Sequence, residues 1–177
     1  MRESVEVVKI AVFNFLIENN IAQDFDKKNY HLHVPHGAIP KDGPSAGVSL
    51  FAALVSIAIN KPVIRSIAMT GEITTLGEVI AIGGVREKLT ACKNHQISRV
   101  ILPISNKKNV TKLPEEFKRG FTIFYVKNIS QAYKICFDQQ ENIEKGEFIE
   151  LLEAGIEIDR FEDDLTSKLI LEQENIS

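Results

Sequence analysis

The chain has 177 residues and a mass of 19.8 kDa, enough for one domain with a sizeable hydrophobic core. Hydrophobic residues make up 44% and charged residues 25%, a globular composition that excludes a wholly disordered or fibrous chain. The net charge of −3 gives no electrostatic reason to expect nucleic acid as a partner, and no apolar run reaches the ~20 residues that span a membrane.

Hydrophobic spacing in the first third of the chain predicts two helices, a strand and a loop. Apolar residues from Val5 to Phe15 recur every three or four positions, which indicates an amphipathic helix. Residues 30–35 (YHLHVP) alternate and are rich in β-forming side chains, so we expect a strand there. A loop rich in glycine and proline follows at 35–47, and the apolar run at 48–59 predicts a helix directly after it.

The rest of the chain alternates strand and helix patterns. Strands are predicted at 63–69, 78–82, 99–103 and 121–126, and helices at 85–95 and 130–137. Strands separated by helices indicate an α/β or α+β domain in which helices pack on a mixed sheet.

Charge is distributed unevenly and predicts a boundary near residue 142. Residues 143–177 carry 11 acidic and 3 basic side chains, a balance of −8, whereas residues 1–142 have a balance of +5. We therefore expect one domain at 1–142 and an acidic C-terminal extension at 143–177 that adds little to the core. The apolar stripe around Phe148 and Leu151 leaves a docked helix as the alternative.

Two cysteines, Cys92 and Cys136, are too few for a disulfide scaffold and suit a reducing compartment. The N-terminal residues MRESVEVVK contain no secretory signal pattern, so we expect a cytoplasmic protein, with an organelle matrix as the alternative. Cys92 and His95 form only an incomplete ligand pair, so no metal site is expected.

The segment GPSAG at 43–47 places Ser45 where a loop meets a helix. The free N–H groups and the positive dipole end of a helix N-terminus favour a developing oxyanion. Serine is also a common helix N-cap, so capping is the simpler interpretation of Ser45 taken alone.

A serine nucleophile needs a base, and the residues alone leave several candidates open. His31, His33, His36 and His95 are available, and spacing selects none of them. A lysine can serve if its pKa falls from about 10.4 toward 7, which requires burial or cationic neighbours. Lys88 begins a helix just after a Gly-Gly turn, which could aim its amine at a cleft.

Three segments together resemble the proteolytic domain of the Lon family of ATP-dependent proteases. They are HLHVPHGAIPKDGPSAGVSLFAALVS at 31–56, AMTGEITTLGEVIAIGGVREKL at 68–89 and RVILPISNKKNV at 99–110. The resemblance runs in order from about residue 1 to about residue 137, and it leaves out the acidic extension.

The resemblance implies roles for five residues. Ser45 falls where the family has its nucleophile, and Lys88 falls where it has the general base of a Ser-Lys dyad. Thr70, in MTGE, matches a threonine near the lysine amine, and Asp42, in KDGPS, matches an acidic residue near the nucleophile. Glu72 matches a position that shapes the substrate groove.

The family resemblance also implies substrates, partners and a cofactor requirement. Such domains assemble into six-membered rings and cut unfolded polypeptides that an attached ATPase module delivers. This chain contains no G-x-x-x-x-G-K-[ST] phosphate loop, so ATP and Mg²⁺ are expected only on a separate ATPase module and no cofactor is expected here. A small-molecule kinase of the GHMP type and a catalytically silent ring-forming module remain the alternatives.

Overall fold

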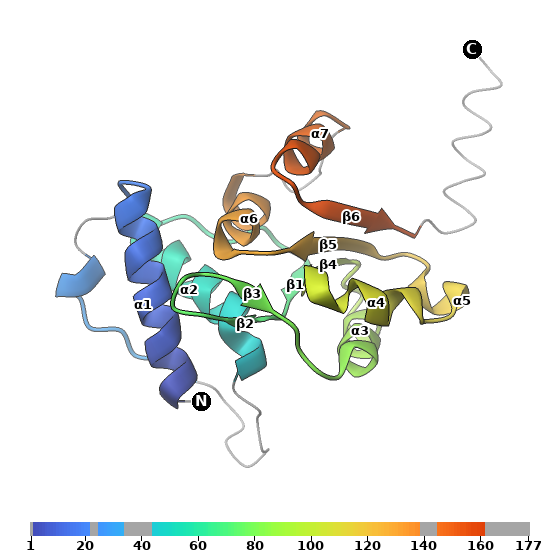
Figure 1. The fold of residues 1–177 in the computed structure, drawn as a ribbon, viewed down its shortest axis with the longest axis horizontal. Helices are drawn as coiled ribbons and strands as arrows, with labels where there is room; N and C mark the ends of the chain where they lie inside the picture. The colour runs from blue at the N-terminus through green and yellow to red at the C-terminus, as the bar shows by residue number, and fades with distance from the viewer. Residues whose placement is uncertain (1, 22–24, 34–43, 139–144, 162–177) are drawn as a thin grey trace.

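The fold is seen in a computed structural model that describes residues 2–21, 25–33, 44–138 and 145–161 (Figure 1). The helices are α1 (Arg2–Glu18), α2 (Gly47–Ile59), α3 (Val85–Asn94), α4 (Lys107–Thr111), α5 (Glu115–Lys118), α6 (Ile129–Tyr133) and α7 (Lys145–Glu153). The strands are β1 (Ile67–Met69), β2 (Glu72–Ile73), β3 (Val79–Ile80), β4 (Arg99–Pro103), β5 (Thr122–Val126) and β6 (Glu157–Arg160). Short 3-10 turns cover Phe25–Lys27, Pro44–Ala46 and Ile104–Asn106, and a π-helical turn covers Lys134–Asp138.

A four-stranded mixed sheet organises the domain in the order β1-β4-β5-β6. Strands β1, β4 and β5 run parallel, whereas β6 pairs antiparallel with β5. A separate antiparallel hairpin, β2–β3, follows β1 in the chain. The prediction of an α/β fold with a mixed sheet and packed helices is therefore confirmed.

Alternating side chains of the two central strands enter two different cores. Ile101 and Phe124 join the larger cluster, to which α1 and α2 also contribute. Val100 and Tyr125 join a second cluster beneath α3 and α4. This period of two is what a strand buried on both faces requires, and it explains why both strands consist almost entirely of apolar residues.

Two sequence-based expectations differ from the observed structure. Residues 30–33 form no strand, because none of the described strands pairs with them and His31, Leu32 and His33 stand exposed. The strand expected at 63–69 is confined to β1, because the Ile64 N–H bonds to the Cys136 carbonyl and Ser66 adopts a φ of 56°. A positive φ interrupts the extended backbone just before β1 begins.

The segment after residue 144 packs against the sheet. Leu151 of α7 and Ile156 before β6 are both fully buried in the larger core. The Gln131 side-chain amide donates to the Ala154 carbonyl at 3.0 Å and so joins α6 to the end of α7. The red α7–β6 segment accordingly lies alongside β5 in Figure 1.

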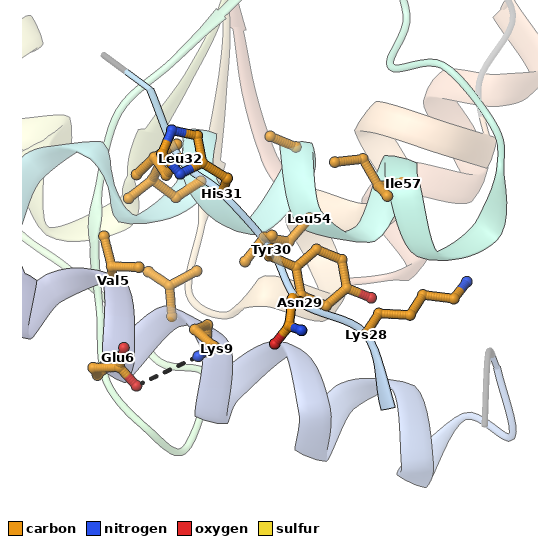
Figure 2. Close-up of a pocket in the computed structure, with 13 residues that line it drawn as sticks. Val5, Glu6, Lys9, Lys28, Asn29, Tyr30, His31, Leu32, Leu54 and Ile57 are labelled. Atoms are coloured by element: carbon orange, nitrogen blue, oxygen red, sulfur yellow. Dashed lines mark ion pairs between the residues drawn. The ribbon is translucent and has the colours of Figure 1, made fainter. Parts of the chain in front are cut away.

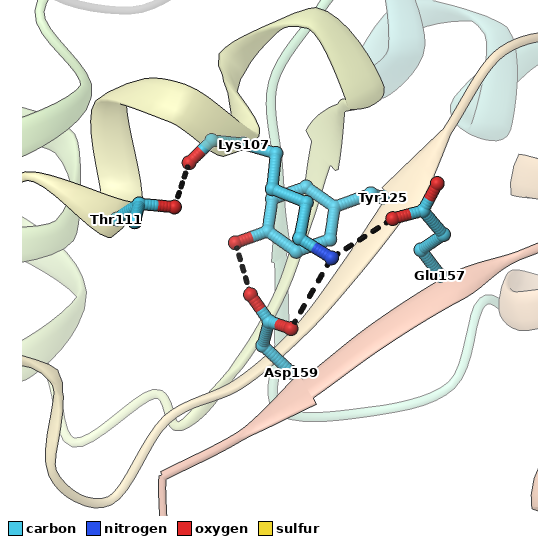
Figure 3. A network of polar contacts seen from close by, with 5 residues as sticks. All are labelled: Lys107, Thr111, Tyr125, Glu157 and Asp159. Carbon is cyan, nitrogen blue, oxygen red and sulfur yellow. Dashed lines mark hydrogen bonds and ion pairs between the residues drawn. The ribbon is translucent and has the colours of Figure 1, made fainter.

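A polar network fastens β6 to the loop that leaves β4 (Figure 3). The Lys107 amine lies 2.8 Å from Glu157 Oε2 and 3.5 Å from Asp159 Oδ1. The Tyr125 hydroxyl donates to Asp159 Oδ2 at 2.9 Å, and burial together with Asp159 raises the pKa of Tyr125 well above its usual range. The Lys107 amine also lies 5.3 Å from the centre of the Tyr125 ring. We call these four residues the β6 latch.

These contacts correct the expectation that residues 143–177 add little to the core, at least for residues 145–161. The net charge of the segment does not prevent packing, because the acidic side chains of β6 pair with Lys107 while apolar residues turn inward. The docked helix that the apolar stripe suggested is present, together with a strand. The division into a domain at 1–142 and an extension at 143–177 stays a prediction.

Candidate active site

Ser45 lies in the 3-10 turn Pro44–Ala46, which leads directly into α2. Its side chain is partly exposed. Ala46, and not Ser45, occupies the N-cap position of α2, and no side chain caps the helix there. The simpler interpretation of Ser45 as a helix cap is therefore not supported, and Ser45 lies just before the N-terminus of α2, where the positive end of the helix dipole is found.

The carboxyl end of β1 holds the turn that carries Ser45. The Ser45 carbonyl accepts hydrogen bonds from the Thr70 hydroxyl at 2.9 Å and from the Gly71 N–H at 3.0 Å. The Gly71 carbonyl in turn accepts from the Val48 N–H at 3.0 Å. Thr70 itself is only 8% exposed, and its N–H donates to the Ile101 carbonyl of β4. Ser45 is thus fixed at the edge where the parallel strands end, the usual ligand-binding edge of such sheets.

Two glycines allow this close approach. A Cβ on Gly47 would lie 2.8 Å from the Ile73 nitrogen, and a Cβ on Gly71 would lie 2.7 Å from a methyl group of Val48. Real Cβ atoms do not approach other atoms so closely, so only glycine fits at either position. Gly47 and Gly71 therefore allow α2 to pack closely against the β2–β3 hairpin.

Lys88 lies in the first turns of α3, and its described contacts are with the Gly83–Gly84 turn. The helix begins after Gly84, which has a φ of 67°, and its buried face of Val85, Leu89 and Cys92 fixes it to the second core. The Lys88 side chain is partly buried, and its amine donates to the Gly83 carbonyl at 3.0 Å. The Gly-Gly turn thus gives the amine a defined anchor.

Thr70 was expected near the lysine amine. Its hydroxyl instead donates to the Ser45 carbonyl, so its observed contact supports the nucleophile's turn. A direct role for Thr70 toward Lys88 stays a prediction.

Sequence reasoning missed Asn106, which follows β4 in the turn Ile104–Asn106. Its side chain is 3% exposed and bonds to both polar groups of the Ile82 backbone. The only sequence signal was the asparagine in PISNKK at the end of a predicted strand, a position where turns commonly place asparagine.

A cavity of about 170 Å³ lies beside the serine turn. Its walls are Pro44, Gly47, Glu72 and Ile73 on one side and the first turns of α1 on the other. Glu72 therefore lies next to the serine turn, as its predicted place in a substrate groove requires, although that role stays a prediction. Asp42 and His36 lie outside the described residues.

The described histidines, His31, His33 and His95, stand in exposed positions and do not line the cavity beside the serine turn. His33 and His95 are exposed, and His31 lines a different cavity of about 560 Å³ between α1, α2 and residues 28–32 (Figure 2). That cavity is lined mainly by apolar side chains such as Leu54 and Ile57. Within the described ranges, no three His, Cys, Asp or Glu side chains gather as metal ligands, and no helix is long and apolar enough to cross a membrane.

The sequence is similar to the proteolytic domains of known Lon proteases. Residues 1–139 match the family model of the Lon protease (S16) C-terminal proteolytic domain. The chain is 42% identical over 139 residues to a Lon protease of Buchnera aphidicola, a match that covers 78% of this chain and 18% of the relative. It is 38% identical over 163 residues to a mitochondrial Lon protease homolog of Drosophila melanogaster, covering 88% of this chain and 16% of the relative. The chain thus spans less than a fifth of the length of these relatives.

Proposed function

Because this chain belongs to the Lon protease (S16) C-terminal proteolytic domain family, we propose that it is a serine endopeptidase with Ser45 as nucleophile and Lys88 as general base. Family membership supports a protease function, and the dyad is our own assignment. The main structural support for Ser45 as the nucleophile is that hydrogen bonds hold the turn in which it lies. The serine carbonyl is held by Thr70 and Gly71, which leaves the side chain partly exposed at the start of α2.

The contacts of Lys88 are compatible with a base. A neutral amine has two N–H donors and one lone pair, so Lys88 can donate to the Gly83 carbonyl and keep its lone pair for a proton. The apolar contacts of α3 hold the backbone of Lys88, so the amine moves only by rotation of its own side chain. The exposed histidines have no comparable anchor in the part of the chain that the structure describes.

The proposed reaction proceeds in two steps. Ser45 Oγ attacks the substrate carbonyl carbon and gives its proton to the neutral Lys88 amine. The tetrahedral intermediate breaks its C–N bond, and the leaving amine takes the proton from Lys88. Water then attacks the acyl-enzyme ester, gives a proton to Lys88, and releases the peptide acid as Ser45 Oγ recovers that proton.

Backbone N–H groups of the serine turn stabilise the oxyanion in this proposal. The Val48 N–H is already bound to the Gly71 carbonyl, so the donors are the N–H groups earlier in the turn. Thr70 and Glu72 support the site by holding the serine turn and by lining the adjacent cavity. Asp42, which lies outside the described residues, is proposed as an acidic residue near the nucleophile on the family resemblance alone.

The wider function is proposed from the resemblance of the sequence motifs to the Lon family. We propose that the substrates are unfolded or damaged polypeptides, that the domain works in a homo-hexameric ring, and that ATP and Mg²⁺ act on a separate ATPase module. Nucleic acid and membrane are not part of this proposal. The compartment we propose is the cytoplasm, with an organelle matrix as the alternative because some relatives are mitochondrial.

Peptide cleavage by two single variants tests the dyad. Ser45→Ala and Lys88→Ala should each abolish hydrolysis of a fluorescently labelled unfolded protein, and the double variant should be no worse than either single, because the two groups act as a unit. Ser49→Ala, in α2 just after the serine turn, and Lys93→Ala, in the same helix α3 as Lys88, are matched controls. Ser49 bonds to the Met69 carbonyl and Lys93 to the Glu116 carbonyl, so both controls should keep activity.

Appreciable cleavage by Lys88→Ala would contradict the assignment of the base. If activity instead fell with a change at His31 or His33, a serine–histidine arrangement would replace the Ser-Lys dyad.

A further inference from the structure

The Asn106 side chain replaces a strand partner for the backbone at Ile82. Asn106 Oδ1 accepts from the Ile82 N–H at 3.0 Å, and Asn106 Nδ2 donates to the Ile82 carbonyl at 2.9 Å. Nδ2 also donates to Asn109 Oδ1 at 3.1 Å, which fixes the orientation of the amide. Because the side chain is almost fully buried, all of these bonds are shielded from competing water.

Ile82 is the residue held by Asn106 just before the Gly-Gly turn that leads into α3. Strand β3 ends at Ile80, and α3 begins at Val85, so residues 81–84 have no regular structure. Gly83 has open space where a Cβ would stand, and Gly84 adopts a left-handed φ. Glycine restricts its own backbone less than any other residue, so the direction of the Gly83 carbonyl depends on the residues on its two sides: Ile82, which Asn106 holds, and Gly84, whose carbonyl accepts from the Lys88 N–H at 3.0 Å.

The Gly83 carbonyl is the acceptor for the Lys88 amine, at 3.0 Å. A path of two hydrogen-bonded contacts, joined by the covalent link between Ile82 and Gly83, therefore runs from Asn106 to the proposed base. Rotation of that carbonyl would break its hydrogen bond with the Lys88 amine. The flexible four-carbon stem of lysine would then let the amine move to other positions.

We propose that Asn106 is a positioning residue for the reaction, which acts on Lys88 by clamping the Ile82–Gly83 peptide. This inference rests on the proposed function, because it presupposes that Lys88 is the base. It assigns to the loop after β4 a part in setting the geometry of the active site, in addition to its structural role.

Gln131 provides a matched control, because it is another buried side-chain amide that clamps two backbone groups. It is 8% exposed, accepts from the Lys127 N–H at 2.7 Å and donates to the Ala154 carbonyl at 3.0 Å. Its contacts lie between α6 and α7 and do not lead to Lys88. A purely structural role for Asn106 would make Asn106→Ala and Gln131→Ala behave alike.

The test compares steady-state peptide hydrolysis and thermal unfolding of four variants of the full chain. Asn106→Ala should lower kcat roughly tenfold or more with KM nearly unchanged, since misplacement of a catalytic group by about 1 Å can cost 10²-fold. Asn106→Asp keeps the acceptor for Ile82 but adds a negative charge, so the acid limb of its pH–rate profile should move to higher pH. Asn109→Ala, at an exposed residue, should show a smaller fall in kcat with its unfolding midpoint kept. Gln131→Ala should unfold at a lower temperature with kcat and the pH–rate profile unchanged.

The outcomes separate this inference from the function on which it rests. Loss of kcat in the Asn106 variants and in Asn109→Ala, with normal kcat in Gln131→Ala, supports the inference. If Lys88→Ala is inactive but both Asn106 variants keep the wild-type kcat and pH–rate profile, Asn106 is only structural and the inference fails alone. If Lys88→Ala remains active, the Ser-Lys dyad fails and the inference fails with it. If Asn106→Ala does not fold, the pH–rate profile of Asn106→Asp and the kcat of Asn109→Ala still test whether Asn106 positions Lys88.

Discussion

Replacing Leu151 tests whether the segment after residue 144 belongs to the core. Leu151 is 1% exposed in α7, whereas its neighbour Leu152 is 56% exposed. Truncation of a buried leucine to alanine costs about 2–5 kcal/mol, because apolar contacts are lost and a cavity remains. For a chain of this size each kcal/mol lowers the unfolding midpoint by about 2–4 °C, so a loss near 3 kcal/mol corresponds to about 6–12 °C.

Thermal unfolding followed by circular dichroism measures this difference directly. Leu151→Ala should lower the midpoint by the amount above, while Leu152→Ala should change stability by no more than about 0.5 kcal/mol. The two variants remove the same atoms one position apart, so helix propensity and composition cancel. Equal midpoints for both variants and the wild type would refute the packing of α7 described here and restore a loosely attached extension.

Three further predictions follow from the site, the latch and the thiols. Gly71→Ala should destabilise the domain by more than about 1 kcal/mol and reduce peptide cleavage, because its Cβ would lie within 2.8 Å of two valine methyl groups, whereas Gly83→Ala has open space and should unfold like the wild type. Hydrogen bonding to Lys107 holds the pKa of Glu157 below its ordinary value of 4.5, so the latch stabilises the fold above about pH 4.5 and weakens as the pH falls below it. The difference in unfolding midpoint between wild type and Glu157→Gln should therefore be present at pH 7 and vanish near pH 3. Burial raises the pKa of Cys136 to about 12, so a thiol reagent at pH 8 should modify Cys136 only as fast as the protein unfolds, and faster labelling of the folded chain would contradict its burial.

The spacing of apolar residues predicted those helices and strands in which most apolar side chains are buried. The strands at 99–103 and 122–126 and the helix at 47–59 were recognisable because nearly every apolar position points into one of two cores. The expected strand at 30–35 shows the opposite case. Its alternation satisfies a strand pattern, but a strand also needs a partner, and none of the described strands pairs with residues 30–33.

The C-terminal strand β6 could not be predicted from its own residues, because its ion pairs involve a residue distant in the sequence. The residues of β6, EIDR, contain one apolar side chain and two carboxylates, which is typical of a solvated tail. Lys107 pairs with both carboxylates from a position about 50 residues earlier, and no local pattern contains that information.

The candidate site could be predicted in part. Ser45 and Lys88 stand in recognisable motifs, and the glycines beside Ser45 have the steric reason that such motifs imply. The contribution of Asn106 could not be foreseen, because it depends on a backbone contact with a residue 24 positions away. The contact between Thr70 and the Ser45 carbonyl likewise exists only because β1 ends beside the N-terminus of α2.

Covalent labelling of Ser45 tests the central claim most directly. A fluorophosphonate reagent esterifies only an activated serine, and mass spectrometry locates the modified residue. Ser45 should be labelled in the wild type and in Lys93→Met, a control on the same helix α3, and labelling should be lost in Lys88→Met. Absence of label on Ser45 in the wild type, or labelling that persists at the same rate in Lys88→Met, would contradict a Ser45–Lys88 dyad.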